Sequence, residues 1–328
     1  MKEKLLLLPL PNTSFSKGER ATDYCSDTVV VPGVDIDFSQ NIRYHLDLTE
    51  TIIDYQNGLY GDFDEKGVPY SFFNGQMVYN PVTILQFGLI CIDLYIGYDR
   101  SEYLDRAINV LDRLEIERIE YLSLPNWAYN SYNEKYSIEA PYYSGMAVGE
   151  AISFYSRMSK ILGNESLMNV ASGCFDFLKI PFEKGGVARI KGKNFYWIEE
   201  YPTNEPSFVL NGFVYSIFGI YDYWKFSSSE EAKSMFELTV NTLLNSLGEY
   251  DIGYWSVYDV LKRELVKKYY QKNVHVPQMM ALYNLTGEQS FLDYGLKWKR
   301  QISTLNLIRV ELMYRIKPRI DQRSLFLR

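Results

Sequence analysis

The feature that most limits what this chain can fold into is a repeated pair of helices. Four segments share one order, an apolar helix, a short break and an amphipathic helix, and they span residues 86–114, 149–178, 211–247 and 278–302. Gly88, Gly149, Gly212 and Ala281 occupy equivalent positions, and the steps between them are 61, 63 and 69 residues. Such a period indicates one helical architecture assembled from similar units.

The two helices of each pair differ in their pattern of apolar residues. The first helix is apolar nearly all round, so we expect it to be buried on every side. The second has apolar residues three and four positions apart, which predicts one exposed face. The breaks carry helix-ending and N-capping residues, namely Gly97 and Asp99, Gly163 and Asn164, Ser227 to Ser229, and Thr286 and Gly287.

Buried helices surrounded by half-exposed helices predict a mainly α fold. We expect an α/α toroid of antiparallel helix hairpins with small β-hairpins in its loops, and an open array of stacked pairs is the alternative. A further helix is expected over residues 42–55. The predicted organisation is a short N-terminal arm (1–38), the toroid domain (39–305) and a C-terminal tail packed on that domain (306–328).

Charge and composition exclude several classes of protein. Acidic residues outnumber basic ones by 41 to 34, which argues against nucleic-acid binding through a basic surface. The 3 cysteines are far apart and only 2 histidines are present, so we expect no disulfide framework, no metal site and no cofactor.

The sequence also bears on location. It contains no apolar stretch near the ~20 residues needed to span a bilayer, so we expect no membrane span. The apolar run at residues 5–10 is short for a signal peptide. We expect a cytoplasmic protein, and a secretory location is the alternative.

Tyrosine is unusually frequent, with 29 residues among 52 aromatics. In a toroid of hairpins the inner helices run in the same direction, so the loops that enter them surround one mouth. These loops read FFNGQMVYNP, EAPYYSG, WIEEYPTNEPS and KKYYQKNVHVP, and each carries tyrosine. Helix N-termini favour anions and amphipathic rings suit sugars, so the mouth is the expected binding site. Basic residues lie in the adjoining segments, although each could instead be part of a solvated surface.

The segment FYWIEEYPTNEPSFVLNG (195–212) resembles the D-glucuronyl C5-epimerase family, whose catalytic helical domain carries a near-identical stretch. Four further segments resemble that family in the same order, NPVTILQFGL (80–89), EAPYYSGMAVGEAIS (139–153), SVYDV (256–260) and YYQKNVH (269–275). The resemblance covers about residues 70–300.

The resemblance implies an isomerase that inverts C5 of D-glucuronic acid units in an anionic, heparosan-like polysaccharide and gives L-iduronic acid. A proton is removed α to the carboxylate and one is returned to the opposite face, which needs two acid/base groups. The resemblance assigns these roles to tyrosines, Tyr201, Tyr258 and Tyr270, with Tyr269 as the alternative for the third. It further implies that Glu200 relays a proton or orients Tyr201, and it allows for a homodimer.

The candidate substrate-binding residues are Tyr143, Arg189, Lys193, Glu199, Asn211, Arg263 and His275. Because an unperturbed tyrosine titrates near ~10, the site needs nearby positive charge to lower that pKa, whereas burial would raise it. Arg189 or the lysines beside Tyr270 are expected to supply the charge. His275 is either a proton shuttle or a buried histidine, and Asn211 contacts either sugar hydroxyls or a neighbouring helix.

Three other functions remain open. A polysaccharide lyase begins with the same proton abstraction, and a tyrosine could serve as its acid. A hydrolase needs paired carboxylates across the scissile bond, for which the adjacent Glu199 and Glu200 are poorly placed unless Glu139 or Asp259 completes the pair. A non-catalytic polysaccharide-binding protein would use the same tyrosines but leave the two glutamates unexplained.

Overall fold

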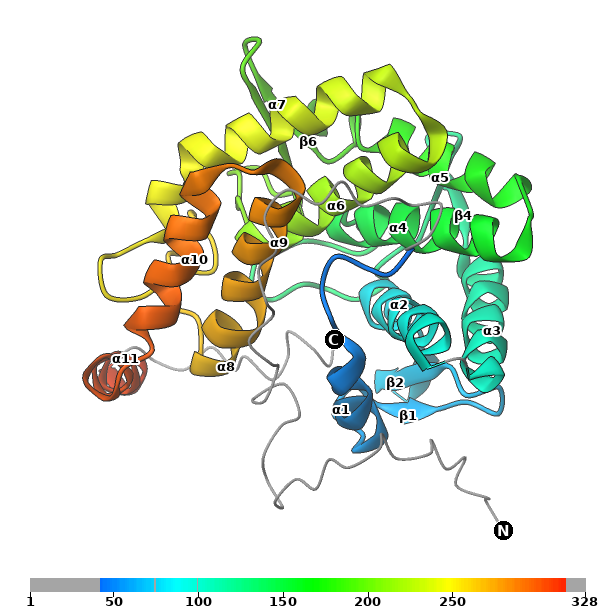
Figure 1. Cartoon of the computed structure of the whole chain (residues 1–328), viewed down its shortest axis with the longest axis horizontal. Helices are drawn as coiled ribbons and strands as arrows, with labels where there is room; N and C mark the ends of the chain where they lie inside the picture. The colour runs from blue at the N-terminus through cyan, green and yellow to red at the C-terminus, as the bar shows by residue number, and fades with distance from the viewer. Residues whose placement is uncertain (1–41, 74, 99, 317–328) are drawn as a thin grey trace.

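The computed structural model describes residues 42–73, 75–98 and 100–316, and the expected arm at 1–38 lies outside these residues. Antiparallel helix hairpins follow one another in an arc around a common centre (Figure 1). The expected fold, an α/α toroid with small β-hairpins in its loops, is confirmed.

Each hairpin pairs one inner helix with one outer helix. The inner helices are α2 (Pro81–Tyr98), α4 (Gly145–Leu162), α6 (Leu210–Ser227) and α9 (Val276–Thr286). The outer helices are α3 (Ser101–Glu117), α5 (Ser166–Phe177), α7 (Glu230–Ser246) and α10 (Gln289–Gln301). As predicted, Gly163 and Gly287 follow their helices in the left-handed conformation and the Ser229 side chain caps α7. In the first break Gly97 lies inside α2, and Asp99 lies outside the described residues. Within the described residues, no helix is both long and apolar enough to cross a bilayer.

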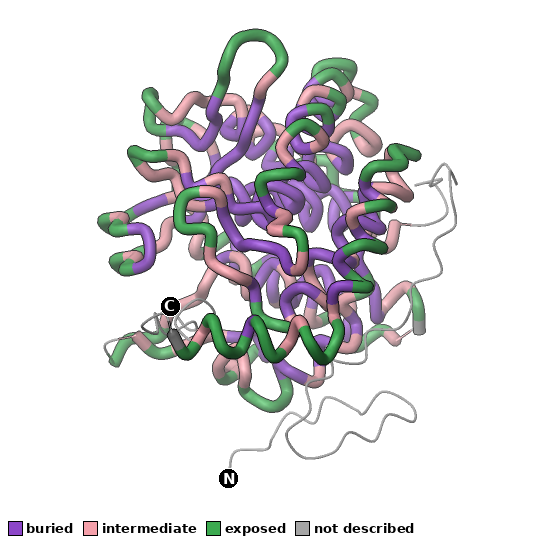
Figure 2. The backbone as a smooth tube through the Cα atoms, turned by 90° about the vertical axis from the view of Figure 1, so that its left-hand side faces the viewer, coloured by how far each residue is buried: buried purple, intermediate pink, exposed green. Residues whose placement is uncertain are grey.

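The inner helices pack at very close range because small residues lie between them. A Cβ atom on Gly149 of α4 would lie 2.6 Å from the Cα atom of Ser216 in α6, so the two backbones can approach only with glycine there. Residues 145–159 of α4 and 210–222 of α6 are buried, while the outer helices keep an exposed face. In Figure 2 the buried segments lie mostly inside and the exposed ones mostly at the periphery. The predicted contrast between inner and outer helices is therefore confirmed.

The helix expected over residues 42–55 is present only in its second half, as a 3-10 turn (Thr49–Thr51) followed by α1 (Ile52–Gln56). The peptide groups before it bond to side chains of the inner helices instead of to each other. Arg157 donates to the carbonyl oxygens of Ile42 (2.9 Å) and Arg43 (3.2 Å), and Asp93 accepts from the Tyr44 amide (2.8 Å). These long-range bonds replace the first turns of the expected helix.

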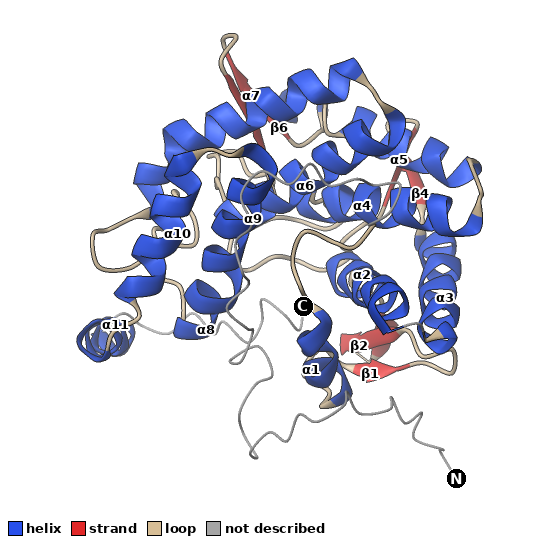
Figure 3. Cartoon of the chain, in the orientation of Figure 1, coloured by secondary structure: helices blue, strands red, loops and turns tan. Residues whose placement is uncertain are grey.

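Strands are confined to short antiparallel hairpins between the helices (Figure 3). They are β1 (Asp62–Phe63), β2 (Pro69–Phe73) and β3 (Gln76–Val78), then β4 (Ile119–Tyr121) with β5 (Leu124–Asn126), then β6 (Ala188–Lys191) with β7 (Phe195–Ile198). Strand β7 positions the site, because the amide of Gly145 at the start of α4 donates to the Glu199 carbonyl just beyond it (2.9 Å).

The last hairpin is entered through a short helix, α8 (Lys268–Tyr270), and a π-helix (Gln271–His275). Further 3-10 turns in the described part of the chain lie at Phe182–Lys184 and Leu247–Tyr250. Helix α11 (Thr304–Ile316) follows α10, so the expected boundary between residues 305 and 306 falls inside it. Val310 of α11 is buried in a small apolar cluster with Trp255 and Tyr258.

Candidate active site

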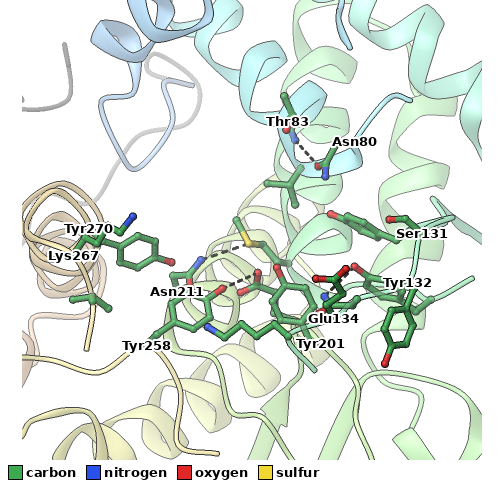
Figure 4. A pocket seen from close by; sticks show the side chains of 18 of the residues that line it. Asn80, Thr83, Ser131, Tyr132, Glu134, Tyr201, Asn211, Tyr258, Lys267 and Tyr270 are labelled. Atoms are coloured by element: carbon green, nitrogen blue, oxygen red, sulfur yellow. Dashed lines mark hydrogen bonds between the residues drawn. The ribbon is translucent and has the colours of Figure 1, made fainter. Parts of the chain in front are cut away.

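A pocket lies where the inner helices begin (Figure 4). Each of the four hairpins contributes to it from its entry segment, through Asn80 before α2, Met146 in α4, Asn211 in α6 and Tyr270 in α8. The entry loops thus surround one mouth, as the common direction of the inner helices requires.

Tyrosine dominates the lining of this pocket. The lining tyrosines are Tyr129, Tyr132, Tyr142, Tyr201, Tyr258, Tyr269 and Tyr270. Several of these rings stack on one another or on a neighbour outside the lining, with centroids 5.0 Å apart for Tyr129 and Tyr142 and 4.9 Å for Tyr136 and Tyr201. Part of the unusual tyrosine content is therefore gathered at one place.

Glu200 is the buried one of the two carboxyl groups that line the pocket, and the other, Glu134, is exposed. The Tyr258 hydroxyl donates to the Oε1 atom of Glu200 at 3.3 Å. Burial raises the pKa of Glu200 to about 7, although the hydroxyl groups of Tyr201 and Tyr258 and the ammonium group of Lys135 act in the opposite direction. Glu200 can therefore both accept and donate a proton near neutral pH.

The three candidate catalytic tyrosines, Tyr201, Tyr258 and Tyr270, all line the pocket. Burial is the largest cause that raises the pKa of each hydroxyl well above its ordinary value, and the Glu200 carboxylate raises all three further. The sequence left open whether nearby positive charge would lower the pKa of these tyrosines or burial would raise it, and burial is the stronger effect here. Each tyrosine is therefore a neutral acid at rest, and a base must remove its proton before it can accept another.

For the third tyrosine, the geometry favours Tyr270 over Tyr269. The Tyr270 ring is buried, and its centroid lies 5.5 Å from that of the Tyr258 ring in an edge-to-face contact. Tyr269 is only partly buried and contacts the Tyr270 ring from 6.0 Å. The π-helix that begins directly after Tyr270 is a form that is frequent at functional sites.

His275 does not line the pocket. Its ring lies against Tyr270 at 5.2 Å, and its Nδ1 atom is 2.9 Å from the Ser256 hydroxyl. Burial lowers the pKa of His275 to about 3, so the imidazole is neutral. These surroundings correspond to the buried-histidine alternative.

Glu199 and Arg189 hold the loop that carries Tyr201, and neither lines the pocket. The Glu199 carboxylate accepts from the Ser207 amide (3.1 Å), the Ser207 hydroxyl (2.7 Å) and the Phe208 amide (3.1 Å). The Arg189 Nε atom lies 3.5 Å from Glu199, and its guanidinium group donates to the Thr203 carbonyl oxygen. The structure therefore places Arg189 away from the position at which it could face a substrate carboxylate.

Three other candidates also lie outside the pocket lining. The Tyr143 ring stacks on Tyr121 at 3.9 Å, Lys193 is exposed between β6 and β7, and Arg263 is exposed beside Glu249. Asn211 does line the pocket. Its amide nitrogen approaches the Met146 sulfur at 3.7 Å, and its Oδ1 atom has no hydrogen-bond partner in the described part of the chain.

Several lining residues were not selected from the sequence, among them Tyr142 and Lys135. Tyr142 stands next to Tyr143 in EAPYYSG, and of the two the structure places Tyr142 in the pocket lining. Its pairing with Tyr129, through amide–carbonyl bonds of 2.9 and 3.2 Å, turns it towards the mouth. Lys135 lies in a loop without periodicity, and no local sequence signal identifies it.

No group of three or more histidine, cysteine or acidic side chains able to hold a metal ion occurs among the residues that the structure describes.

Part of the chain is similar to proteins of a known family. Residues 121–300 match the model of the family described as D-glucuronyl C5-epimerase C-terminus. A D-glucuronyl C5-epimerase of Caenorhabditis elegans is 34% identical over 133 residues, which cover 36% of this chain and 21% of that protein. An uncharacterized protein of Methanocaldococcus jannaschii is 30% identical over 176 residues, which cover 53% of this chain and 56% of that protein.

The chain thus spans about half the length of one curated relative and about a fifth of the other. Among solved structures, a D-mannose isomerase superimposes with a TM-score of 0.50 over 84% of this chain and 72% of that chain, at 11% identity. This similarity concerns the fold.

Proposed function

This chain belongs to the D-glucuronyl C5-epimerase family, and on that premise we propose that it inverts C5 of D-glucuronic acid units in a heparosan-like polysaccharide. The observation that carries the proposal is that one buried carboxyl group, Glu200, accepts a hydrogen bond from Tyr258 and acts electrostatically on Tyr201 in the same pocket. Two phenols beside one carboxyl group suit a reaction that removes a proton from one face of a sugar and returns one to the other.

In the proposed reaction the sugar ring lies between Tyr201 on one side and the Tyr258–Tyr270 pair on the other. A deprotonated phenol takes the C5 proton, the electron pair moves into the carboxylate to give a planar enolate-like intermediate, and the opposite phenol donates its proton to C5. No bond to the neighbouring sugar breaks, and the reaction needs no oxidant or reductant.

Glu200 is proposed to prepare the phenols for this reaction. Because its pKa is raised to about 7, its carboxylate can take the proton of one tyrosine and later give it to the other. Each phenol would therefore be charged only during turnover, which agrees with the burial that keeps the resting phenols neutral.

The test is incubation of the full chain with unsulfated heparosan in deuterated water, followed by disaccharide and mass analysis. The proposal predicts iduronate and deuterium at C5. An unsaturated uronate, detected by its ultraviolet absorbance, would instead identify a lyase, and shorter saturated chains would identify a hydrolase. Binding of heparosan without label or cleavage would identify a binding protein.

A further inference from the structure

Lys135 lies on the loop between β5 and α4, and it brings a buried positive charge to the pocket. Its side chain is only 6% exposed. The Nζ atom is 4.1 Å from the centroid of the Tyr258 ring, closer than to the Tyr136 ring at 5.4 Å. An ammonium group with little access to water therefore faces one of the proposed proton-transfer residues.

Two carboxylates keep this ammonium group in place. Its Nζ atom lies 2.8 Å from Glu264 and 3.8 Å from Asp259, and the Tyr136 hydroxyl donates to the same Asp259 carboxylate at 2.9 Å. A buried ammonium without partners would cost several kcal/mol, so these pairs allow the charge to remain at a fixed position. Both partners belong to the segment that carries Tyr258, and Lys135 and Tyr258 are thus held together.

We propose that Lys135 is a positioning residue for proton transfer that acts through Tyr258, because its fixed charge over the ring stabilises the phenolate relative to the phenol. An opposite charge at ~4–6 Å favours the ionised form of a group, and a cation over the ring face adds to this attraction. The inference rests on the function proposed above, in which Tyr258 must become deprotonated.

The other groups around Tyr258 disfavour the phenolate. Glu200 faces it from the end of β7, and Tyr136, Tyr201 and Tyr270 face it from three further segments. Asp259 and Glu264, on its own segment, are the partners of Lys135. Among the described residues that line the pocket, Lys135 and Lys267 are the cationic ones, and Lys267 is exposed. Lys135 is thus the buried charge that opposes the carboxylates.

The first experiment measures the ionisation of Tyr258 directly. A fluorinated tyrosine at position 258 of the full chain reports its own titration by ¹⁹F NMR, and the fluorine lowers the intrinsic pKa into the range where the protein stays folded. Lys135→Gln should raise the titration midpoint by about one pH unit or more, since an opposite charge at this distance shifts a pKa by about 1–3 units. Glu264→Gln should lower the midpoint, because it removes the charge that offsets Lys135.

Lys262→Gln is the matched control, because this lysine is exposed on the same segment and should leave the midpoint unchanged. Lys135→Arg keeps the charge and should stay near the native midpoint. Equal midpoints in the native, Lys135→Gln and Glu264→Gln proteins, or shifts of the last two in the same direction, would overturn the proposal. If Lys135→Gln does not fold, the direction of the Glu264→Gln shift decides.

The second experiment follows C5 exchange on heparosan as a function of pH. The rate profile of Lys135→Gln should move to higher pH by the same amount as the NMR midpoint, and Lys135→Arg should restore the native profile. A lower rate with an unmoved profile would show a merely structural role and overturn the inference. The NMR titration needs no substrate, so absence of exchange in the native protein would contradict the proposed function alone.

Discussion

The carboxyl group of Glu200 occupies the space that a Cβ atom on residue 212 would fill, so Gly212 is what allows this side chain to pack directly on the backbone of α6. The Asn-Gly step inside an otherwise apolar helix is explained by this contact. It also joins the start of an inner helix to the carboxyl group that contacts Tyr201 and Tyr258.

Gly212→Ala should therefore displace Glu200 while leaving the helix in place, since alanine favours a helix over glycine by about 1 kcal/mol. We expect turnover to fall by at least ~100-fold, the low end of what a positioned acid or base contributes. Exchange kinetics together with thermal unfolding measure the two effects separately. Gly248→Ala is the control and should keep native turnover, because this glycine is exposed and an added Cβ would meet only the Tyr294 hydroxyl, at 3.8 Å.

Replacing Tyr201, Tyr258 or Tyr270 by phenylalanine keeps each ring and removes its hydroxyl. Each change should lower epimerisation by at least ~100-fold with little loss of stability. If the tyrosines act on opposite faces, a single variant should still exchange the C5 proton of either glucuronate or iduronate. Deuterium exchange on the two substrates separately measures this, and Tyr254→Phe, outside the pocket lining, is the control. Full activity of Tyr201→Phe would remove that residue from the mechanism.

Glu200 also makes stability depend on pH. Burial raises its pKa from 4.5 to about 7, so the unfolded chain loses this proton at lower pH than the native protein does. The stabilisation from a protonated Glu200 is thus complete below pH ~4.5 and is lost as the pH rises through ~7. Glu200→Gln should gain stability relative to the native protein between these limits, by on the order of 3 kcal/mol at ~1.4 kcal/mol per pKa unit.

Urea unfolding of both proteins at acidic and mildly alkaline pH measures this difference. Glu205→Gln, on the exposed side of the same loop, should show the pH dependence of the native protein. A difference between Glu200→Gln and the native protein that does not grow with pH would contradict the raised pKa.

Arg157→Met tests the contacts that replace the first turns of the expected N-terminal helix. Although burial favours the neutral form of Asp222, the charge of Arg157 and the hydrogen bond with His45 hold its pKa at about 2, so the Arg157–Asp222 pair is ionised. Removing the arginine leaves the buried Asp222 carboxylate with His45 as its remaining partner and takes the donor from the carbonyl oxygens of Ile42 and Arg43. This should cost about 3–5 kcal/mol of unfolding free energy. Lys160→Met, at an exposed position of the same helix, should change stability by less than ~1 kcal/mol.

The sequence predicted the hairpins and the common mouth because both follow from local patterns, apolar periodicity and capping residues. The helix over residues 42–55 was wrong in its first half because Arg157 and Asp93, which bind that backbone, are distant in sequence. Lys135 was not selected from the sequence for the same reason, because its partners Asp259 and Glu264 are more than a hundred residues away. Contacts of this kind leave no periodic signal.

The candidate site likewise contains residues that local sequence predicted correctly to lie in the pocket and residues that it did not. Glu200, Tyr201, Asn211, Tyr258 and Tyr270 stand in segments shared with the family and meet in the pocket. Arg189 was selected for its charge, but charge alone does not say which way a side chain points, and this one binds the loop through Glu199. The choice between Tyr142 and Tyr143 depended on strand alternation in a loop where the sequence shows no strand.

The pocket draws on the entry segments of all four hairpins, and this has a consequence for how the molecule loses activity. The lining phenols and Glu200 come from the entry segments of the last three hairpins, and none of these three contains the complete set. Opening of any one of these three hairpins therefore disassembles the site, even while the others stay folded. The fraction of molecules able to turn over is limited by the weakest of the three, whatever the stability of the chain as a whole.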